Sequence, residues 1–109
     1  MSAYIVYNYN ILDRSRIDEL TQLSLPIIQK YKAEVIVGSP VKTLEGNTFS
    51  GMVIYKFESF EAAERFYYSK EQQELSELRK EITEGFVTIV PGDSETQKLV
   101  DSGYFESKS

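Results

Sequence analysis

Between residues 53 and 69 the spacing of the apolar side chains changes from every second residue to every third or fourth, and this change constrains the fold more than any other feature. Residues 53–57 are β-branched or aromatic except at Lys56, which is typical of a half-buried strand. From Phe60 onward the apolar residues recur at helical spacing. Ser59 stands between the two patterns, where its hydroxyl can accept hydrogen bonds from the free amides of a first helical turn. A strand is therefore predicted to run into a helix at Ser59.

A second helical segment is predicted to begin at Ser69, directly after the first. Ser69 and Gln72 have the spacing of a capping box, in which each side chain satisfies the other residue's backbone amide. The apolar stripe of this segment consists of Leu75, Leu78 and Ile82. Gly85 then permits the left-handed conformation that ends many helices. Residues 86–90 are predicted to form the last strand.

The N-terminal part is predicted to be a strand followed by a long helix. Residues 4–9 are aromatic or β-branched except at Asn8, and Asp13 stands where a helix can begin. Pro26 lacks a backbone donor, so it should kink this helix or divide it, with a bend within residues 22–26. The side chains expected to face inward are those of Ile17, Leu20, Leu23, Ile27 and Tyr31.

Two more strands are predicted between the helical regions. Residues 34–37 form a short strand, and residues 38–40 interrupt it with a bulge or an edge break. An extended path resumes at residues 41–44. A turn over residues 45–48 then leads into the strand at residues 53–57.

The resulting order is β, α, β, β, α, β. It predicts an α+β domain of the ferredoxin-like type over residues 1–92, with a four-stranded antiparallel sheet and both helices on one face. One domain agrees with a length of 109 residues. Residues 93–109 form a C-terminal extension that we expect to be partly flexible, with a short helix over residues 96–100.

The predicted strands carry apolar side chains on both faces. Two helices cover only one face of a four-stranded sheet, so the other face needs a partner. A second copy packed sheet against sheet about a two-fold axis is the simplest partner, and we therefore expect a homodimer. The alternative is a monomer whose tyrosine-rich face is partly exposed.

The composition argues against several classes of function. The chain has 12 Lys plus Arg against 17 Asp plus Glu, and its basic residues are scattered, which disfavours nucleic acid as a partner. It contains no Cys and no His, so it lacks disulfides, thiol nucleophiles and the commonest metal ligand and general base. We expect no metal and no cofactor. The sequence shows no signal-peptide pattern and no apolar stretch of membrane-spanning length, which predicts a cytoplasmic protein without membrane contact.

Several motifs follow one another in a defined order: Leu44-Glu45-Gly46, Phe57-Glu58-Ser59-Phe60-Glu61-Ala62-Ala63, Phe66-Tyr67-Tyr68-Ser69, and the downstream Gln73 and Arg79. In this order and spacing they resemble the uncharacterised bacterial family called domain of unknown function 1330, over about residues 3–92. Lys70 stands where that family usually has Pro, and Gln72 stands where it usually has Tyr. No role of that Tyr hydroxyl is therefore carried over to this chain.

The resemblance implies a dimeric α+β barrel. This architecture is shared with small cofactor-independent monooxygenases, muconolactone isomerase-like enzymes, haem-degrading proteins and stress-responsive barrel proteins. Fold alone does not choose among these activities. The absence of His disfavours the His-ligated haem-degrading branch.

Arg79 and Asn8 are two candidates for a ligand-binding site. If Arg79 turns toward the sheet, its guanidinium can hold a carboxylate or an enolate in a bidentate pair. The alternative is a solvated Arg79 that pairs with acidic residues of its own helix. Asn8 stands on an apolar strand, where its amide needs either a partner within the protein or a ligand.

Tyr67 and Glu45 are two further candidates. Tyr67 and Tyr68 cannot both face the core, so one of them can present its hydroxyl to a pocket, or both are packing residues. Glu45 beside Gly46 is either a general base on a mobile loop or a solvated turn residue. For Ser59, a helix cap is favoured over a nucleophile because no base accompanies it.

These residues do not establish a catalytic centre. The function they favour is the binding, with or without conversion, of a small organic molecule in a pocket between the sheet and the helices. The alternative is a non-catalytic dimeric module for ligand binding or assembly.

Overall fold

Within residues 2–47 and 49–106, which the computed structural model describes, the chain forms four strands, four α-helices and one 3-10 helix. These elements, in chain order, are β1 (Ala3–Ile11), η1 (Arg14–Arg16), α1 (Ile17–Lys30), β2 (Glu34–Pro40), β3 (Gly51–Phe57), α2 (Phe60–Tyr67), α3 (Lys70–Ile82), β4 (Thr83–Pro91) and α4 (Asp93–Asp101).

The four strands form one antiparallel sheet in the order β2-β3-β1-β4. Strand β1 lies in the middle, with Tyr7 opposite Val53 of β3 and Val87 of β4. This order and the chain connectivity are those of the ferredoxin-like fold. The predicted fold class is confirmed.

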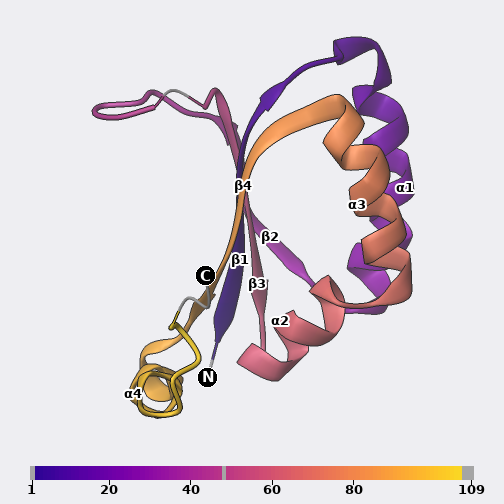
Figure 1. Cartoon of the computed structure of the whole chain (residues 1–109). Coiled ribbons are helices and arrows are strands. Elements are labelled where there is room, and N and C mark those ends of the chain that lie inside the picture. The colour runs from indigo at the N-terminus through magenta and orange to yellow at the C-terminus, as the bar shows by residue number, and fades with distance from the viewer. Residues whose placement is uncertain (1, 48, 107–109) are drawn as a thin grey trace.

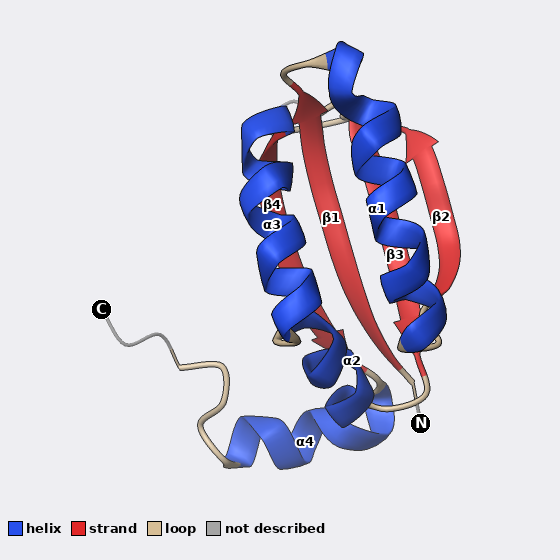
Figure 2. Ribbon diagram, turned by 90° about the vertical axis from the view of Figure 1, so that its right-hand side faces the viewer, coloured by secondary structure: helices blue, strands red, loops and turns tan. Residues whose placement is uncertain are grey.

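Helices α1, α2 and α3 all lie on one face of the sheet (Figures 1 and 2). Helix α4 lies on the other side, beside the end of the sheet where the chain begins (Figure 1). It spans Asp93–Asp101 and is therefore longer than the helix predicted over residues 96–100. The last residues of the extension, 107–109, lie outside the described part of the chain.

The core lies between the sheet and the three helices that cover it. The largest fully buried side chains are those of Ile5, Phe57, Phe66 and Ile82. The ring of Phe66 packs against the rings of Tyr55 and Phe57, with centroid distances of 5.7 and 5.1 Å. Such aromatic pairs stabilise a core by about 0.5–1.5 kcal/mol each beyond the area they bury. Helix α2 is therefore held firmly against β3.

The strand-to-helix junction at Ser59 forms as predicted. The Ser59 hydroxyl accepts a hydrogen bond from the Ala62 amide at 3.1 Å and so caps α2. From the C-terminal extension, a Glu95 carboxylate oxygen accepts a hydrogen bond from the Phe60 amide at 3.2 Å. Two of the free amides at this helix end are therefore satisfied by side chains.

Only half of the predicted capping box at Ser69 forms. The Ser69 hydroxyl accepts a hydrogen bond from the Gln72 amide at 3.2 Å, as expected. The Gln72 side chain does not return to Ser69. It is 4% exposed and donates a hydrogen bond to the Tyr7 hydroxyl oxygen at 3.2 Å. The burial of this side of α3 against the sheet takes the Gln72 amide away from the helix end.

Pro26 does not divide the helix that contains it. Helix α1 runs from Ile17 to Lys30 without interruption, with Pro26 inside it. Of the two predicted outcomes, a kink or a division, the division does not occur. Pro26 is exposed, and a lost backbone hydrogen bond on the solvent side leaves a carbonyl that water can reach.

The irregularity in β2 lies earlier than predicted. The register against β3 shifts between Val35 and Val37, whereas residues 38–40 pair regularly with residues 51–53. Beyond the strand, the Val41 amide donates to the Ser50 carbonyl at 3.0 Å. The bulge falls on an edge strand, where an extra residue disrupts only one ladder.

Gly85 does not end a helix. Helix α3 stops at Ile82, and Gly85 lies inside β4 with a φ of +151°. A Cβ atom at this position would lie 1.9 Å from the Asn8 backbone oxygen on the adjacent strand. Glycine is needed here because β1 and β4 approach each other too closely for a side chain.

Candidate functional site

A cavity of about 190 Å³ lies between the sheet and the helices that cover it. Strands β1, β3 and β4 and helices α1, α2 and α3 all contribute to its wall. The apolar part of the wall includes Leu20, Ile28, Val53, Phe66 and Leu75. Thr21 of α1 is an exposed residue of the wall, so the cavity reaches solvent beside α1.

Among the described residues of the cavity wall, Arg79 of α3 alone carries a full charge at neutral pH. It is half-buried, and its Nε atom is buried without a hydrogen-bond partner. Among the described residues, no carboxylate oxygen lies within ion-pair distance of the guanidinium. Its Cζ atom lies 5.4 Å from the centroid of the Tyr7 ring. The cavity thus holds a cation whose contact within the protein is the face of an aromatic ring.

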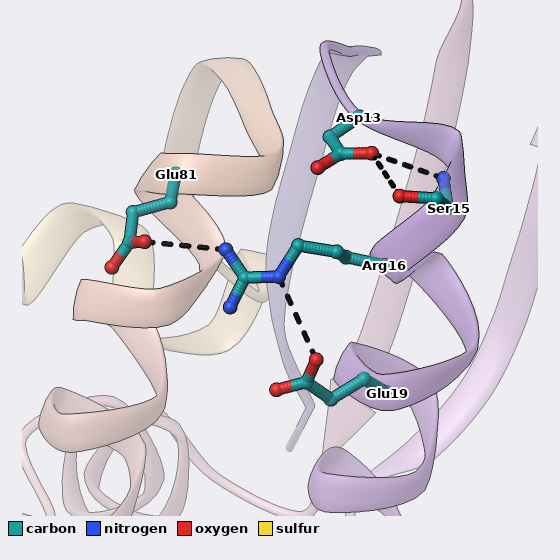
Figure 3. Close-up of polar contacts among 5 residues, drawn as sticks. All are labelled: Asp13, Ser15, Arg16, Glu19 and Glu81. Atoms are coloured by element: carbon teal, nitrogen blue, oxygen red, sulfur yellow. Dashed lines mark hydrogen bonds and ion pairs between the residues drawn. The ribbon is translucent and has the colours of Figure 1, made fainter.

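Two other cations near these helices, Arg16 and Lys30, have acidic partners. Arg16, at the start of α1, contacts the Glu81 carboxylate of α3 at 3.2 Å and the Glu19 carboxylate at 3.6 Å (Figure 3). Lys30, at the end of α1, contacts Glu71 of α3 at 2.5 Å. These pairs join α1 and α3 near both ends. Arg79 lies between the two links on α3 and is left without such a pair.

Tyr7 of β1 lies beside Arg79 in the cavity wall. Its hydroxyl oxygen accepts the hydrogen bond from Gln72, and no described residue accepts the hydroxyl proton. Burial raises the pKa of Tyr7 above its usual range, and the charge of Arg79 opposes this effect only in part. The phenol therefore stays protonated at neutral pH and can donate a hydrogen bond to a ligand.

Two more tyrosines complete the polar side of the sheet surface. Tyr55 meets Tyr7 edge to face, with a centroid distance of 5.7 Å, and burial raises the pKa of Tyr55. Tyr9 lies over Gly51, where a Cβ atom would come within 2.8 Å of the Tyr9 ring. Both tyrosines line the cavity. Among the described residues, the wall therefore contains phenols and a guanidinium, and no carboxylate.

Asn8 contributes to the cavity wall in a different way from Arg79. Side chains alternate along a strand, so Asn8 belongs to the sheet face opposite to that of Tyr7 and Tyr9. Its Oδ1 atom is nevertheless buried without a hydrogen-bond partner. An unsatisfied buried amide is uncommon in folded proteins.

Tyr67 and Glu45 do not line the cavity. Tyr67 is half-buried against the core, and its ring meets the Tyr68 ring edge to face at 5.2 Å. Glu45 is exposed on the loop between β2 and β3, which projects from the sheet on the side away from α1 and α3 (Figure 1). Of the four candidates, Arg79 and Asn8 therefore belong to the cavity wall, whereas Tyr67 and Glu45 do not.

Tyr7, Gln72 and Thr83 line the cavity but were not selected from the sequence. A signal for Gln72 was present, because Gln72, Leu75 and Arg79 stand at positions i, i+3 and i+7 of one helix and share a face. Tyr7 gave no such signal, since it is one of several tyrosines on its strand. Thr83 gave no signal because the sequence predicts a loop there, whereas α3 ends at Ile82 and β4 begins directly at Thr83.

The described residues contain no cluster of three or more acidic side chains that could hold a metal ion. In the same part of the chain, no helix is both long enough and apolar enough to span a membrane. What the cavity offers is apolar surface and hydrogen-bond donors. This chemistry suits a small ligand with an apolar body and a negatively charged oxygen.

The family profile described as domain of unknown function (DUF1330) matches residues 2–93. The chain belongs to this DUF1330 family. A comparison with curated proteins finds no match. The family membership predicted from the motifs around Ser59 is therefore confirmed.

Solved structures share the fold of this DUF1330 protein at low sequence identity. A protein of unknown function from Rhodopseudomonas palustris aligns with a TM-score of 0.67 and 11% identity, over 84% of this chain and 82% of that chain. SnoaB, a cofactor-independent oxygenase from Streptomyces nogalater, aligns with a TM-score of 0.56 and 6% identity, over 84% and 92%. A hydroxynitrile lyase from Passiflora edulis aligns with a TM-score of 0.56 and 17% identity, over 84% and 93%. These likenesses establish an α+β barrel fold and leave the activity open.

Proposed function

We propose that the protein binds a small organic anion, such as a carboxylate or an enolate, in the cavity between the sheet and α1, α2 and α3. The observation that carries this proposal is the unpaired guanidinium of Arg79 in a largely apolar wall. A buried charge without a partner is costly, and a ligand of opposite charge removes that cost. The proposal leaves open whether the bound molecule is converted.

The size of the cavity limits the ligand to about one ring. An engineered apolar cavity of about 150 Å³ binds benzene, and this cavity measures about 190 Å³. Benzoate is therefore a suitable probe, because it combines one ring with one carboxylate. Two of the similar folds belong to an oxygenase and a lyase, but their names do not transfer a substrate to this chain.

The test is calorimetric titration of the protein with benzoate. The wild type should bind, and Arg79→Met should weaken binding at least about tenfold, the expected loss for a charge-assisted hydrogen bond. Lys80→Met is the matched control, since it removes a cation from the adjacent, exposed position of the same helix. Equal binding by the wild type and Arg79→Met would contradict the proposal.

We propose in addition that the protein is a homodimer that buries the outer face of its sheet. This face carries Val6, Ile54 and Val90, and α1, α2 and α3 all lie on the opposite face (Figure 1). Phe86 is 58% exposed on the same side. An apolar sheet face of this kind needs a partner, and two-fold packing satisfies both copies at once.

Sedimentation at micromolar concentration tests the homodimer. The wild type should sediment as a dimer, and Ile54→Lys should yield monomers because a charge would be buried at the interface. Leu23→Lys on the solvent side of α1 is the control and should stay dimeric. A wild type that is monomeric at this concentration would refute the proposed interface and support the alternative of an exposed sheet face.

A further inference from the structure

The cavity wall offers hydrogen-bond donors without a group that could take up a proton. Its ionisable side chains are those of Arg79, Tyr7, Tyr9 and Tyr55. The part of the cavity wall that the structure describes includes no Asp, Glu or Lys, and the chain contains no His. A ligand therefore cannot lose a proton to a carboxylate or an imidazole in this wall.

The internal hydrogen bonds leave several donor groups of the wall free for a ligand, among them the adjacent Arg79 and Tyr7. The Gln72 amide is used by Tyr7, and the Thr83 hydroxyl donates to the Arg79 carbonyl at 3.1 Å. The guanidinium of Arg79 and the hydroxyl of Tyr7 have no acceptor among the described residues. In their ordinary protonation states both groups can donate a hydrogen bond to a ligand. The Tyr7 hydroxyl oxygen already accepts the bond from Gln72.

We infer that the cavity selects weak oxygen acids with a single ring, namely phenols and cyclic enols, and binds them as oxyanions. The proton passes to water through the open side of the cavity, and the anionic oxygen accepts hydrogen bonds from Arg79 and Tyr7. No covalent bond is formed or broken apart from this ionisation. The inference rests on the proposed anion site and names its ligand class.

The charge distribution of the ligand favours this class over carboxylates. A carboxylate concentrates its charge on two oxygens, which together accept about four hydrogen bonds. A phenolate or enolate spreads its charge into a conjugated ring, so its transfer into an apolar wall costs less.

Tyr7 shows why the charge of Arg79 is available to a ligand. The guanidinium lies over the Tyr7 ring and makes no hydrogen bond to its oxygen, so burial outweighs the charge and the phenol stays neutral. A ligand oxygen that contacts the guanidinium directly gains a charge-assisted hydrogen bond instead. A contact of this kind lowers the pKa of an acid by about 1–3 units.

The experiment is a spectroscopic titration of 4-nitrophenol, whose phenol and phenolate absorb at different wavelengths. With the wild type in excess, the pKa of the bound probe should fall by at least about one unit, which equals tenfold tighter binding of the phenolate than of the phenol. Arg79→Met should abolish the shift, and Arg79→Lys should retain part of it because the charge is kept. Tyr7→Phe should weaken phenolate binding about fivefold through the loss of one hydrogen bond.

Matched controls and a second probe make each outcome decisive. Lys80→Met and Tyr68→Phe alter exposed positions and should leave the shift unchanged. An unshifted or raised pKa of the bound probe would overturn the inference. Benzoate binding without 4-nitrophenol binding would also overturn it while leaving the proposed function intact. Failure of both probes would overturn both proposals.

Discussion

The guanidinium of Arg79 lies 5.4 Å from the centre of the Tyr7 ring, and its Nε atom is buried without a hydrogen-bond partner. Arg79 belongs to α3, one of the helices that cover the sheet, and Tyr7 belongs to β1 in the middle of the sheet. Their contact places a positive charge and a neutral phenol on one wall of a small cavity. The charge and the phenol form the proposed site for an anionic ligand.

Replacing Arg79 by Met should stabilise the protein in the absence of ligand. The variant removes a buried nitrogen that lacks a partner, and such an unsatisfied group costs about 1–3 kcal/mol. We expect the free energy of unfolding in urea to rise by about 1 kcal/mol, because Arg79 is only half-buried. Lys80→Met should change it little. A clear loss of stability in Arg79→Met would show that Arg79 is a structural residue.

The hydrogen bond between Gln72 and Tyr7 should be measurable as a coupling between the effects of the two residues on the free energy of unfolding. Gln72→Leu and Tyr7→Phe each leave one buried partner unsatisfied, so each should lower the free energy of unfolding by about 1–2 kcal/mol. The double variant should lose less than the sum of the two, as a double-mutant cycle measures. Gln22→Leu, at an exposed position of α1, serves as the control. Additive losses would argue against the bond.

Gly85→Ala should be among the most destabilising single changes in the sheet. The added Cβ would lie 1.9 Å from the Asn8 oxygen, so the strands must separate, and we expect a loss of at least about 2 kcal/mol. Gly46→Ala also places a side chain at a positive φ, +89°, but meets no atom within 4 Å and should cost about 1–2 kcal/mol. Gly38→Ala should be nearly neutral. Denaturant unfolding ranks the three variants by their loss in the free energy of unfolding. A small loss for Gly85→Ala would contradict the close approach of β1 and β4.

The ion pair between Lys30 and Glu71 should make stability depend on acidic pH. The hydrogen bond from Lys30 lowers the pKa of Glu71 from 4.5 to about 2. The depressed pKa means that the contribution is complete above pH 4.5 and is lost as the pH falls toward 2. As the pH is lowered through this window, the melting temperature of Glu71→Gln should therefore fall less steeply than that of the wild type. Glu77→Gln, on the exposed side of the same helix, should follow the wild type.

The fold could be predicted from the sequence because its signals are local. Ser59 caps the helix that it precedes, and the side-chain periodicity on either side of it identifies a strand and a helix. The errors arose where a distant contact overrides such a signal. Gly85 looked like a helix end, but the carbonyl of Asn8 on the adjacent strand is what requires glycine there. Likewise, the Gln72 side chain donates a hydrogen bond to the Tyr7 hydroxyl oxygen instead of capping its own helix.

The candidate site could be predicted only in part. The sequence left open whether Arg79 faces the sheet or is solvated, and the structure places it in the cavity wall. For Tyr67, helical spacing indicates partial burial but does not show which residues the side chain packs against. Glu45 lies on a loop that projects from the sheet, and no local pattern predicts where such a loop goes (Figure 1).

By itself, the sequence determined the order of strands and helices, the ferredoxin-like topology and the family, since periodicity and capping residues act within a few positions of the chain. Only the tertiary structure decided that Arg79 has no acidic partner among the described residues, although its helix carries several Glu residues, and that its charge faces Tyr7. Whether a helical Arg pairs with a neighbour or enters a cavity depends on how α3 packs on the sheet. That packing follows from contacts between residues far apart in the sequence.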